Sequence, residues 1–427
     1  MFISTLHERG ALLLFIAVIF SASYIYPRLR VKQRLKQIPL MGEELGGYYK
    51  RRNEFLRDPM RFYWEGYQRC KNKCFRVTHY EERINHHLVS EVEKTVDEVI
   101  GPCEEWTSHP IYRTSLRIVA IVSGSVYVGP DMYPGWMRPI ARFFKCERTQ
   151  LAKSWNHLKA SKRLVVPIIQ QRREEVQAGR ASYDDMLAWM MAKQDEWKQT
   201  DDDVAGSMVQ LGVASTHNTS STIAQTLFQL AIRPELVGEL REEAQSVCDQ
   251  FDGQLSPVAL HELKLLDSVM KEAQRLNPTT PSHFHRVVER DITLKDGTLI
   301  PQGITVEAIF APPLFDPVLF PNPQEFDPYR FLKLRRGETP DPNHYKNKEQ
   351  YTFSHATKEN LAWGYGAHVC PGRYFANNEI KLILARMLLR YDIRMPGGVK
   401  EVMKPQRGGM GWTPDLRKPI EFRAIRR

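Results

Sequence analysis

Cysteine is scarce in this sequence, and the cysteines that exist are spread along it. The 427 residues include six, and no two of them form a Cys-x-x-Cys pair. Disulfide-stapled secreted domains need many cysteines, and zinc ribbons and fingers need close pairs. The sequence therefore argues against both classes and favours the reducing, cytosolic side of a membrane.

Internal repeats and long low-complexity tracts are also absent. Hydrophobic residues make up 42% of the chain and charged residues 26%, as in ordinary globular proteins. This composition excludes a fibrous repeat and a chain that is disordered throughout. A length of 427 residues leaves room for one large helical unit or for two or three smaller ones.

Acidic residues are outnumbered, since 50 Asp and Glu against 60 Lys and Arg give a net charge of +10. A nucleic-acid binder would place this excess on a stripe with interleaved aromatic side chains, and the sequence has no such stripe. Five basic residues lie close together instead, at positions 28, 30, 32, 34 and 36. They are better placed to orient a membrane segment and to contact anionic lipid than to bind nucleic acid.

One long apolar run precedes these basic residues. Gly10 to Tyr26 carries no charge, and about 17 residues is the lower limit for a membrane-spanning helix. A cleaved signal would carry its basic residues before the run, so their order favours an uncleaved anchor with the rest of the chain in the cytosol. A cleaved signal or a buried core helix is the alternative. The predicted organisation is a lumenal tail and anchor over 1–27, a basic, Pro- and Gly-containing hinge over 28–47, and one domain over 48–427.

Helical spacing dominates that domain. Apolar residues recur three and four positions apart in segments near 88–100, 111–126, 150–175, 204–232, 234–250, 258–276 and 373–391. Strand patterns are rare. The clearest is Asp291 to Val306, where Asp296-Gly297 predicts a hairpin turn and Pro301-Gln302-Gly303 a second turn. The patterns predict a mainly α fold with a small β part.

The segment that best supports a chemical function starts at Trp363 and reads WGYGAHVCPGRYFA. Its glycines let the backbone turn tightly and approach a flat partner. Cys370 comes just before Pro371, a typical helix start, and an amphipathic run from Tyr374 to Leu389 follows. A helix N-terminus stabilises a thiolate, and a thiolate in an apolar loop suits the axial position of haem iron. A buried cysteine alone is more often an inert small hydrophobic residue, so the surrounding pattern decides.

That pattern resembles the haem-binding signature of the cytochromes P450, F/W-G-x-G-x-R/H-x-C-x-G, at every defined position. The resemblance implies the cytochrome P450 fold, haem b as the cofactor, and a cysteine thiolate as the axial ligand of the iron. The residues it implies for cofactor binding are Cys370, Trp363, Gly366, His368, Gly372 and Arg286. Among these, Cys370 would bind the iron, and Arg286 and His368 match positions that partner the haem propionates.

Two further motifs follow the family's order. Glu272 and Arg275 form its E-x-x-R motif, and FDPYRF, which contains Arg330, resembles the motif that supplies a second arginine. Residues three apart on a helix share a face and can form an ion pair, although an isolated E-x-x-R is more often a surface pair. The resemblance implies that these three residues form a structural triad that supports the cysteine loop.

A fourth motif lies in one long predicted helix over 203–232, about 45 Å in length. In the family, an acid and two threonines in its middle deliver protons to bound oxygen, and fungal members often read A-x-x-H-T-T. In this sequence His217 fits, Asn218 replaces the first threonine without offering a hydroxyl, and Thr219 lies about 100° further round the helix. The resemblance implies a catalytic role for these three residues; polar capping inside a kinked helix is the alternative.

The sequence departs from the family in two stretches, near 78–88 and 128–136, which are short, and in lacking a W-x-x-x-R motif. A trimmed distal pocket or a spliced or mispredicted product would account for them. Substrate choice is expected to depend on Val213 to Thr216 and on Thr279 to His285.

The function implied by the resemblance is that of a fungal, microsomal haem-thiolate monooxygenase. It would lie at the endoplasmic reticulum membrane with its catalytic domain in the cytosol, and take NADPH-derived electrons from a reductase. It would insert one oxygen atom from O₂ into a lipophilic small molecule, with a terpenoid or another secondary metabolite as the candidate by analogy. One alternative is a haem-thiolate isomerase or dehydratase without a reductase, which Asn218 favours. The other is a non-enzymatic relative with a defective pocket, which the short stretches favour.

Overall fold

The computed structural model describes residues 89–128, 151–181, 183, 185–400, 406–408 and 411–425. The predicted anchor over 10–26, the hinge over 28–47 and the short stretch near 78–88 lie outside these residues, as does nearly all of the stretch at 128–136. None of the helices in the described ranges is both long enough and apolar enough to cross a bilayer.

The chain divides into two compact units, which we call the helical unit and the sheet unit. Of the described residues, the sheet unit contains Thr280–Pro313, Gly408 and Gly411. The helical unit contains the other described residues. Each unit is described by itself.

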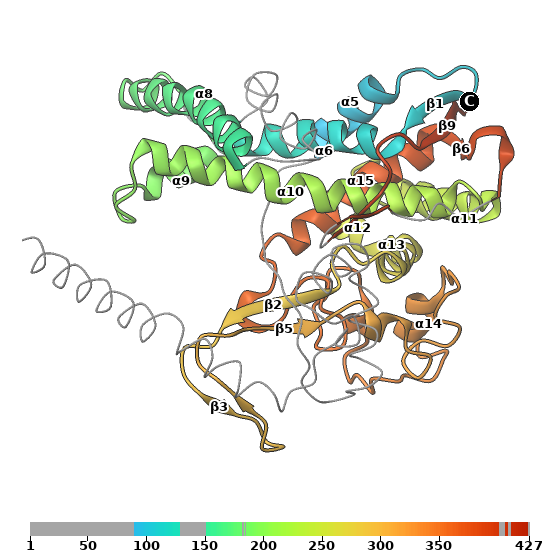
Figure 1. The fold of residues 1–427 in the computed structure, drawn as a ribbon. Coiled ribbons are helices and arrows are strands. Elements are labelled where there is room, and N and C mark those ends of the chain that lie inside the picture. The colour runs from blue at the N-terminus through green and yellow to red at the C-terminus, as the bar shows by residue number, and fades with distance from the viewer. Residues whose placement is uncertain are drawn as a thin grey trace, which may run out of the picture. The chain divides into compact units, whose positions relative to one another are not determined.

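Helices make up most of the described chain (Figure 1). The α-helices are α5 (Val89–Ile100), α6 (Ile111–Val128), α8 (Leu151–Gln177), α9 (Met186–Lys193), α10 (Asp201–Leu230), α11 (Pro234–Gln250), α12 (Pro257–Glu262), α13 (Lys264–Leu276), α14 (Arg330–Arg336) and α15 (Arg373–Arg390). Short 3₁₀-helices are η5 (Pro312–Phe315), η6 (Lys348–Tyr351), η7 (Gly366–His368) and η8 (Pro396–Gly398).

The strands are short, and they form small antiparallel groups. In the helical unit, β1 (Thr107–Pro110), β9 (Pro419–Ala424) and β6 (Tyr391–Arg394) make one sheet in the order β1-β9-β6. In the sheet unit, β2 (Ser282–Val287) pairs with β5 (Thr305–Ile309), and β3 (Ile292–Thr293) pairs with β4 (Leu299–Ile300). A further ribbon joins β7 (Gln406–Gly408) to β8 (Gly411–Thr413). The predicted mainly α fold with a small β part is confirmed.

The prediction of one helix over 258–276 is wrong, because this segment contains two helices, α12 and α13. Leu263 lies between them in a non-helical conformation, with φ −71° and ψ 71°. Glu243 of α11 accepts hydrogen bonds from the N–H groups of Leu265 (2.6 Å) and Leu266 (3.0 Å). A carboxylate from another helix therefore satisfies the first amides of α13, which makes a new helix start favourable at this point.

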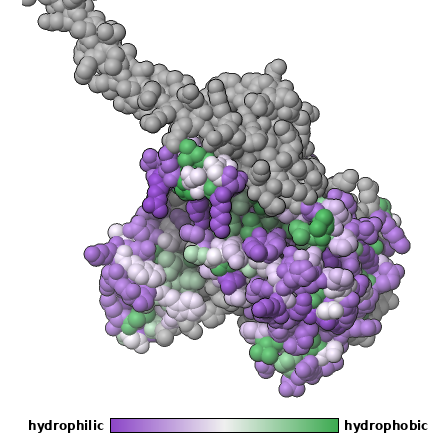
Figure 2. All heavy atoms as spheres, turned by 90° about the horizontal axis from the view of Figure 1, so that it is seen from below, coloured by the Kyte–Doolittle hydropathy of each residue, from purple (hydrophilic) through white to green (hydrophobic). Residues whose placement is uncertain are grey.

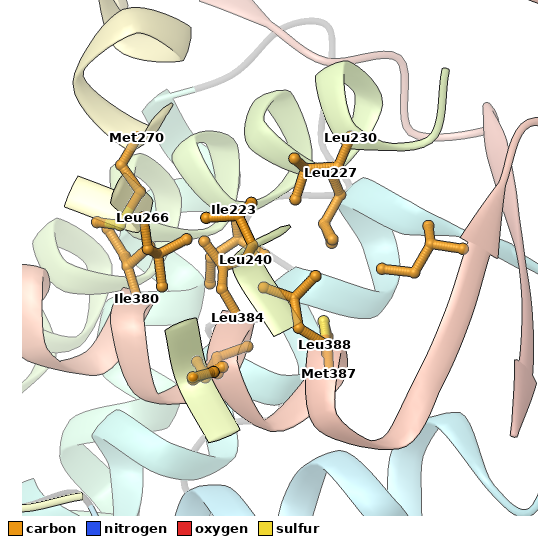
Figure 3. Close-up of a cluster of buried hydrophobic side chains, with 14 of the residues drawn as sticks. Ile223, Leu227, Leu230, Leu240, Leu266, Met270, Ile380, Leu384, Met387 and Leu388 are labelled. Atoms are coloured by element: carbon orange, nitrogen blue, oxygen red, sulfur yellow. The ribbon is translucent and has the colours of Figure 1, made fainter. Parts of the chain in front are cut away.

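The long helix α10 is central to the core of the helical unit. It begins with a capping box between Thr200 and Asp203 and runs for 30 residues. Side chains from its C-terminal half pack against α11, α13 and α15 (Figure 3), and the labelled examples include Ile223, Leu227, Leu240, Leu266, Ile380 and Leu384. Each such side chain contributes about 1.5–3 kcal/mol when fully buried.

A second apolar cluster surrounds the N-terminal half of α10. It joins α6, α8, α9 and α10 through side chains such as Ala120, Val165, Leu187, Val204 and Met208. The apolar residues that give α10 its helical spacing are buried in these two clusters. On the face of the molecule shown in Figure 2, hydrophilic residues cover most of the described surface, and hydrophobic ones form small separate spots.

The predicted amphipathic run over 374–389 forms α15, but its middle is not amphipathic. Every residue from Glu379 to Ala385 is buried, including Glu379 and Lys381. Glu379 accepts a hydrogen bond from the hydroxyl of Ser123 on α6 (2.8 Å), and Lys381 pairs with Asp267 on α13 (2.8 Å). Partners on neighbouring helices let ionisable side chains lie on faces that the sequence pattern assigns to solvent.

The burial of Glu379 predicts a specific pH dependence of stability. Burial raises the pKa of Glu379 to about 8 from 4.5. Below pH 4.5 both folded and unfolded chains carry the proton, whereas between these two values only the folded chain keeps it. This residue therefore destabilises the fold increasingly as pH rises through that window, by an amount on the order of 4 kcal/mol.

Glu379→Gln should remove this effect, because glutamine is neutral, has the same size and still accepts from Ser123. We expect the variant to gain stability over the wild type at pH 8 and to differ much less at pH 5. Denaturant unfolding at the two pH values measures the difference. A gain that is the same at both would contradict the assignment.

The sheet unit contains both predicted turns. The hairpin at Asp296-Gly297 is confirmed, since Ile292 on β3 lies opposite Ile300 on β4. The second turn leads into β5, but β5 pairs with β2 rather than with β4. Gly303 has a φ of +83° and donates its N–H to the carbonyl of Val288 (2.7 Å), so this turn directs the chain back toward β2.

Candidate functional site

Cys370 lies at the end of a tightly folded loop of the helical unit, three residues before α15 begins. The loop turns at Gly364, whose N–H donates to the carbonyl of Leu361 (2.8 Å), and continues through η7. The N–H of Cys370 then donates to the carbonyl of Trp363 (2.7 Å). The thiol is half-buried. Hydrogen bonds within the loop fix the backbone that carries this thiol.

Gly364 has two separate reasons to be glycine. Its φ is +74°, a conformation that residues with a Cβ rarely adopt. A Cβ built at this position would lie 3.0 Å from the carbonyl oxygen of His368, closer than an ordinary van der Waals contact. The two limbs of the loop therefore lie against each other, and no side chain fits between them.

Gly364→Ala should cost more than alanine at another glycine of the same conformation. Gly337 has a φ of +71° and nothing within 4 Å of an added Cβ, so Gly337→Ala measures the backbone penalty alone, about 1–2 kcal/mol. We expect Gly364→Ala to add the clash with His368 to this penalty. Urea unfolding and haem retention compare the two variants; equal losses in both would contradict the argument.

Trp363 connects the cysteine loop to the chain before it. Its indole Nε1–H donates to the carbonyl of Phe353 (2.6 Å). The two rings meet edge to face, with centroids 5.3 Å apart and an angle of 86°. Because the carbonyl of Trp363 also accepts from Cys370, a shift of the tryptophan would move the cysteine.

The structure brings together the three residues predicted as a structural triad. Glu272, which is completely buried, accepts from the Nε and Nη2 groups of Arg275 (both 2.8 Å) and from Nε of Arg330 (3.0 Å). The guanidinium of Arg275 also donates to the carbonyls of Leu314, Pro323 and Glu325. The cluster ties α13 to the chain leading into α14 and is buried, which fits a structural role.

The three catalytic candidates on α10 do not converge on one point. Nδ1 of His217 lies 2.6 Å from the hydroxyl of Tyr112 on α6, and burial lowers the pKa of His217. Asn218 is exposed, whereas Thr219 is 4% exposed. Consecutive helical residues point about 100° apart, so these side chains lie on different sides of the helix.

Hydroxyl groups near these candidates bond back to the helix itself. Thr216 donates to the carbonyl of Gly212 (2.6 Å), and Ser220 donates to that of Thr216 (2.6 Å). Such bonds satisfy buried hydroxyls and bend helices slightly. They give part of this polar segment a structural role, as expected if its polar side chains cap a kinked helix rather than take part in catalysis.

Arg286 belongs to the sheet unit, on β2 opposite Val306. The pairing of β2 is irregular between His283 and Arg286, and Phe284 in this bulge has a φ of +58°, which is unusual for a residue with a large side chain. Nη1 of Arg286 donates to the carbonyl of His285 (2.8 Å). The role of Arg286 beside a haem propionate stays a prediction.

The loop residues fit a haem-thiolate group. Cys370 offers a half-buried thiol, η7 leaves Gly366 and His368 exposed beside it, and Gly372 caps the start of α15. The absence of room for a Cβ at Gly364 shows that the loop is already closed around its own backbone. The residues on this loop could hold haem, with Cys370 as the ligand of its iron.

Two residues of this arrangement were not predicted from the sequence. Tyr112 contacts His217 from 105 positions away, so no local pattern could reveal it. Phe353 contributes its main-chain carbonyl to Trp363, a role that any residue type can play. An aromatic residue ahead of the loop is only a weak signal for the ring contact.

Comparisons with known proteins agree with this geometry. The sequence model of the cytochrome P450 family matches residues 121–420. Cytochrome P450 monooxygenase AN1598 of Emericella nidulans is 32% identical in an alignment 333 residues long that covers 70% of this chain and 60% of the relative. Cytochrome P450 monooxygenase ORF5 of Penicillium roqueforti is 31% identical in an alignment 361 residues long that covers 77% of this chain and 64% of the relative.

A solved structure shares the fold. The retinoic acid-bound cyanobacterial CYP120A1 aligns with a TM-score of 0.60 at 19% identity, over 78% of this chain and 74% of that chain. The chain spans 60% to 64% of the length of the two curated relatives above. Because the family match extends over more than half of its 427 residues, the chain belongs to the cytochrome P450 family.

Proposed function

We propose that this chain is a haem-thiolate monooxygenase that inserts one oxygen atom from O₂ into a lipophilic small molecule. One observation is the main support for the proposal: Cys370 carries a half-buried thiol on a loop that hydrogen bonds of Trp363 hold in place. The names of the matched fungal relatives support it, since they are cytochrome P450 monooxygenases.

Haem b would supply oxygen activation, with electrons that a reductase draws from NADPH. The chain's own residues would bind and orient the group. The Cys370 thiolate would hold the iron and release electron density toward it. Arg286 and His368 would pair with the propionates, and Gly366 would let the backbone lie close to the flat ring.

Proton transfer would depend on α10. Burial lowers the pKa of His217 and so favours its neutral ring, and the Tyr112 hydroxyl, 2.6 Å from Nδ1, orients this ring. The exposed amide of Asn218 would hold a water molecule, and Thr219 would offer the one hydroxyl of the three candidates.

The proposed substrate is a terpenoid or another lipophilic secondary metabolite. The apolar run at 10–26 and the basic residues after it support an anchor in the endoplasmic reticulum membrane, with the catalytic domain in the cytosol. A lipophilic substrate would partition into that membrane. The net charge of +10 would favour docking of an acidic NADPH-dependent reductase.

The test is product formation by membranes that contain the full-length chain and a reductase, with a panel of lipophilic substrates. The proposal expects a hydroxylated product that needs NADPH, O₂ and Cys370. Conversion without NADPH or reductase would identify an isomerase or dehydratase instead, as the asparagine at position 218 favours. A full-length protein that binds no haem would be a non-enzymatic relative.

A further inference from the structure

A buried ion pair joins α13 to α15. Asp267, in the first turn of α13, and Lys381, in the middle of α15, are 3% and 2% exposed. Their charged atoms, Oδ1 and Nζ, are 2.8 Å apart. Removing two charges from water costs free energy unless further hydrogen bonds satisfy the charged groups. The other contacts of this pair therefore indicate what it does.

The second oxygen of Asp267 leads to the cysteine loop. Oδ2 accepts a hydrogen bond from the N–H of Phe353 (2.8 Å). The carbonyl of Phe353 accepts from the indole of Trp363 (2.6 Å), and the carbonyl of Trp363 accepts from the N–H of Cys370 (2.7 Å). A continuous series of hydrogen bonds thus connects the buried carboxylate to the backbone of the proposed iron ligand.

A second lysine holds the same segment from α13. Lys271 is 3% exposed, and its ammonium donates to the carbonyls of Thr352 (2.8 Å) and Gln350 (3.3 Å). The main chain leading to Phe353 is therefore bound at several points by side chains of α13. This arrangement fixes the position of a peptide group, which is more than the pairing of two charges requires.

We propose that Asp267 is a positioning residue for the cysteine loop, with Lys381 holding its carboxylate in place. The proposal rests on the proposed function, because Cys370 is an iron ligand only in a haem-thiolate protein. Asp267 fixes the peptide of Phe353, this peptide fixes the indole of Trp363, and Trp363 fixes the backbone of Cys370. Outer hydrogen bonds of this kind orient ligands and tune the metal that they bind.

Two double variants separate this role from plain ion pairing. Asp267→Asn with Lys381→Met removes both charges but keeps a side-chain oxygen that can accept from Phe353. Asp267→Leu with Lys381→Met removes both charges and this acceptor. Both double variants also remove the carboxylate charge that lies 4.0 Å from the buried guanidinium of Arg335, and this loss is the same in each. The two variants should therefore differ mainly at the acceptor.

Two measurements on the full-length chain follow the loop. The first is the reduced, carbon monoxide-bound spectrum, in which intact thiolate ligation absorbs at about 450 nm and its loss shifts the band to about 420 nm. The second is the alkylation rate of Cys370, with and without added haem, relative to the half-buried Cys248. The second readout does not need a bound cofactor.

We expect the variant with leucine at position 267 to increase both the 420 nm fraction and the relative alkylation of Cys370 several-fold. The variant with asparagine at that position should stay within about twofold of the wild type, because the acceptor remains. The control is Asp185→Asn, which breaks a buried pair with Arg172 (2.7 Å) between α8 and α9. It should lower stability and leave both readouts unchanged.

Equal behaviour of the two double variants, or a matching response in the control, would overturn the proposal. If the leucine variant does not fold, the single variants Asp267→Ala and Lys381→Met take its place. Both break the pair, but only the first removes the acceptor, so equal exposure of Cys370 in both would overturn the proposal as well. A wild type without a band at about 450 nm would refute the proposed function alone, since the alkylation of Cys370 would still test the positioning.

Discussion

The Cys370→Ala variant is expected to lose its haem during purification while keeping its fold. The thiol is half-buried, so its removal opens no large cavity in the core. Alanine also keeps the backbone N–H that donates to Trp363. The ratio of haem to protein after gel filtration, together with circular dichroism, separates loss of the ligand from loss of structure.

Cys248→Ala provides the matched control, because Cys248 is a second half-buried cysteine on α11. Burial raises the pKa of the Cys248 thiol, which disfavours the thiolate form that binds iron. This variant should retain haem at the wild-type ratio. Full haem retention by Cys370→Ala would remove the basis for assigning that residue as the ligand.

The largest loss of stability is expected for Glu272→Ala. This carboxylate is the charged partner of Arg275 and Arg330, and the side chains of Glu272 and Arg275 are 0% exposed. Its removal leaves buried guanidinium charge without its counter-ion, which costs about 3–5 kcal/mol. Since a typical domain is stable by only about 5–15 kcal/mol, we expect a much lower denaturation midpoint and poor haem incorporation.

Glu338→Ala is the control for a glutamate next to an arginine on the surface. Glu338 lies 3.6 Å from Arg336, and both side chains are at least half exposed. Such a pair contributes about 0–1 kcal/mol. A Glu272→Ala midpoint close to that of Glu338→Ala would show that the buried cluster does not stabilise the protein as argued.

Much of the fold could be predicted from the sequence because long helices repeat their apolar spacing many times. Helix α10 was expected over 203–232 and runs over 201–230. The helices α9 and α14 were missed, since 8 and 7 residues cover barely two turns. The break at Leu263 was missed for another reason: the carboxylate that caps α13 comes from α11.

The candidate site, like the fold, has one part that the sequence predicts and another part that it does not. The cysteine loop is contiguous, and its glycines, aromatic residue and cysteine have fixed spacing, so the sequence shows it directly. The contacts of Tyr112, Asp267 and Phe353 join segments far apart in the chain, and one partner is often a main-chain group. The middle of α15 was misjudged for a similar reason, because buried partners for Glu379 and Lys381 lie on other helices.

The central claim is that Cys370 binds haem iron as a thiolate, and the reduced, carbon monoxide-bound absorption spectrum of the purified full-length protein tests it most directly. A band at about 450 nm that disappears in Cys370→Ala is the predicted result. No haem band, or a band at about 420 nm that the same variant leaves unchanged, would contradict it.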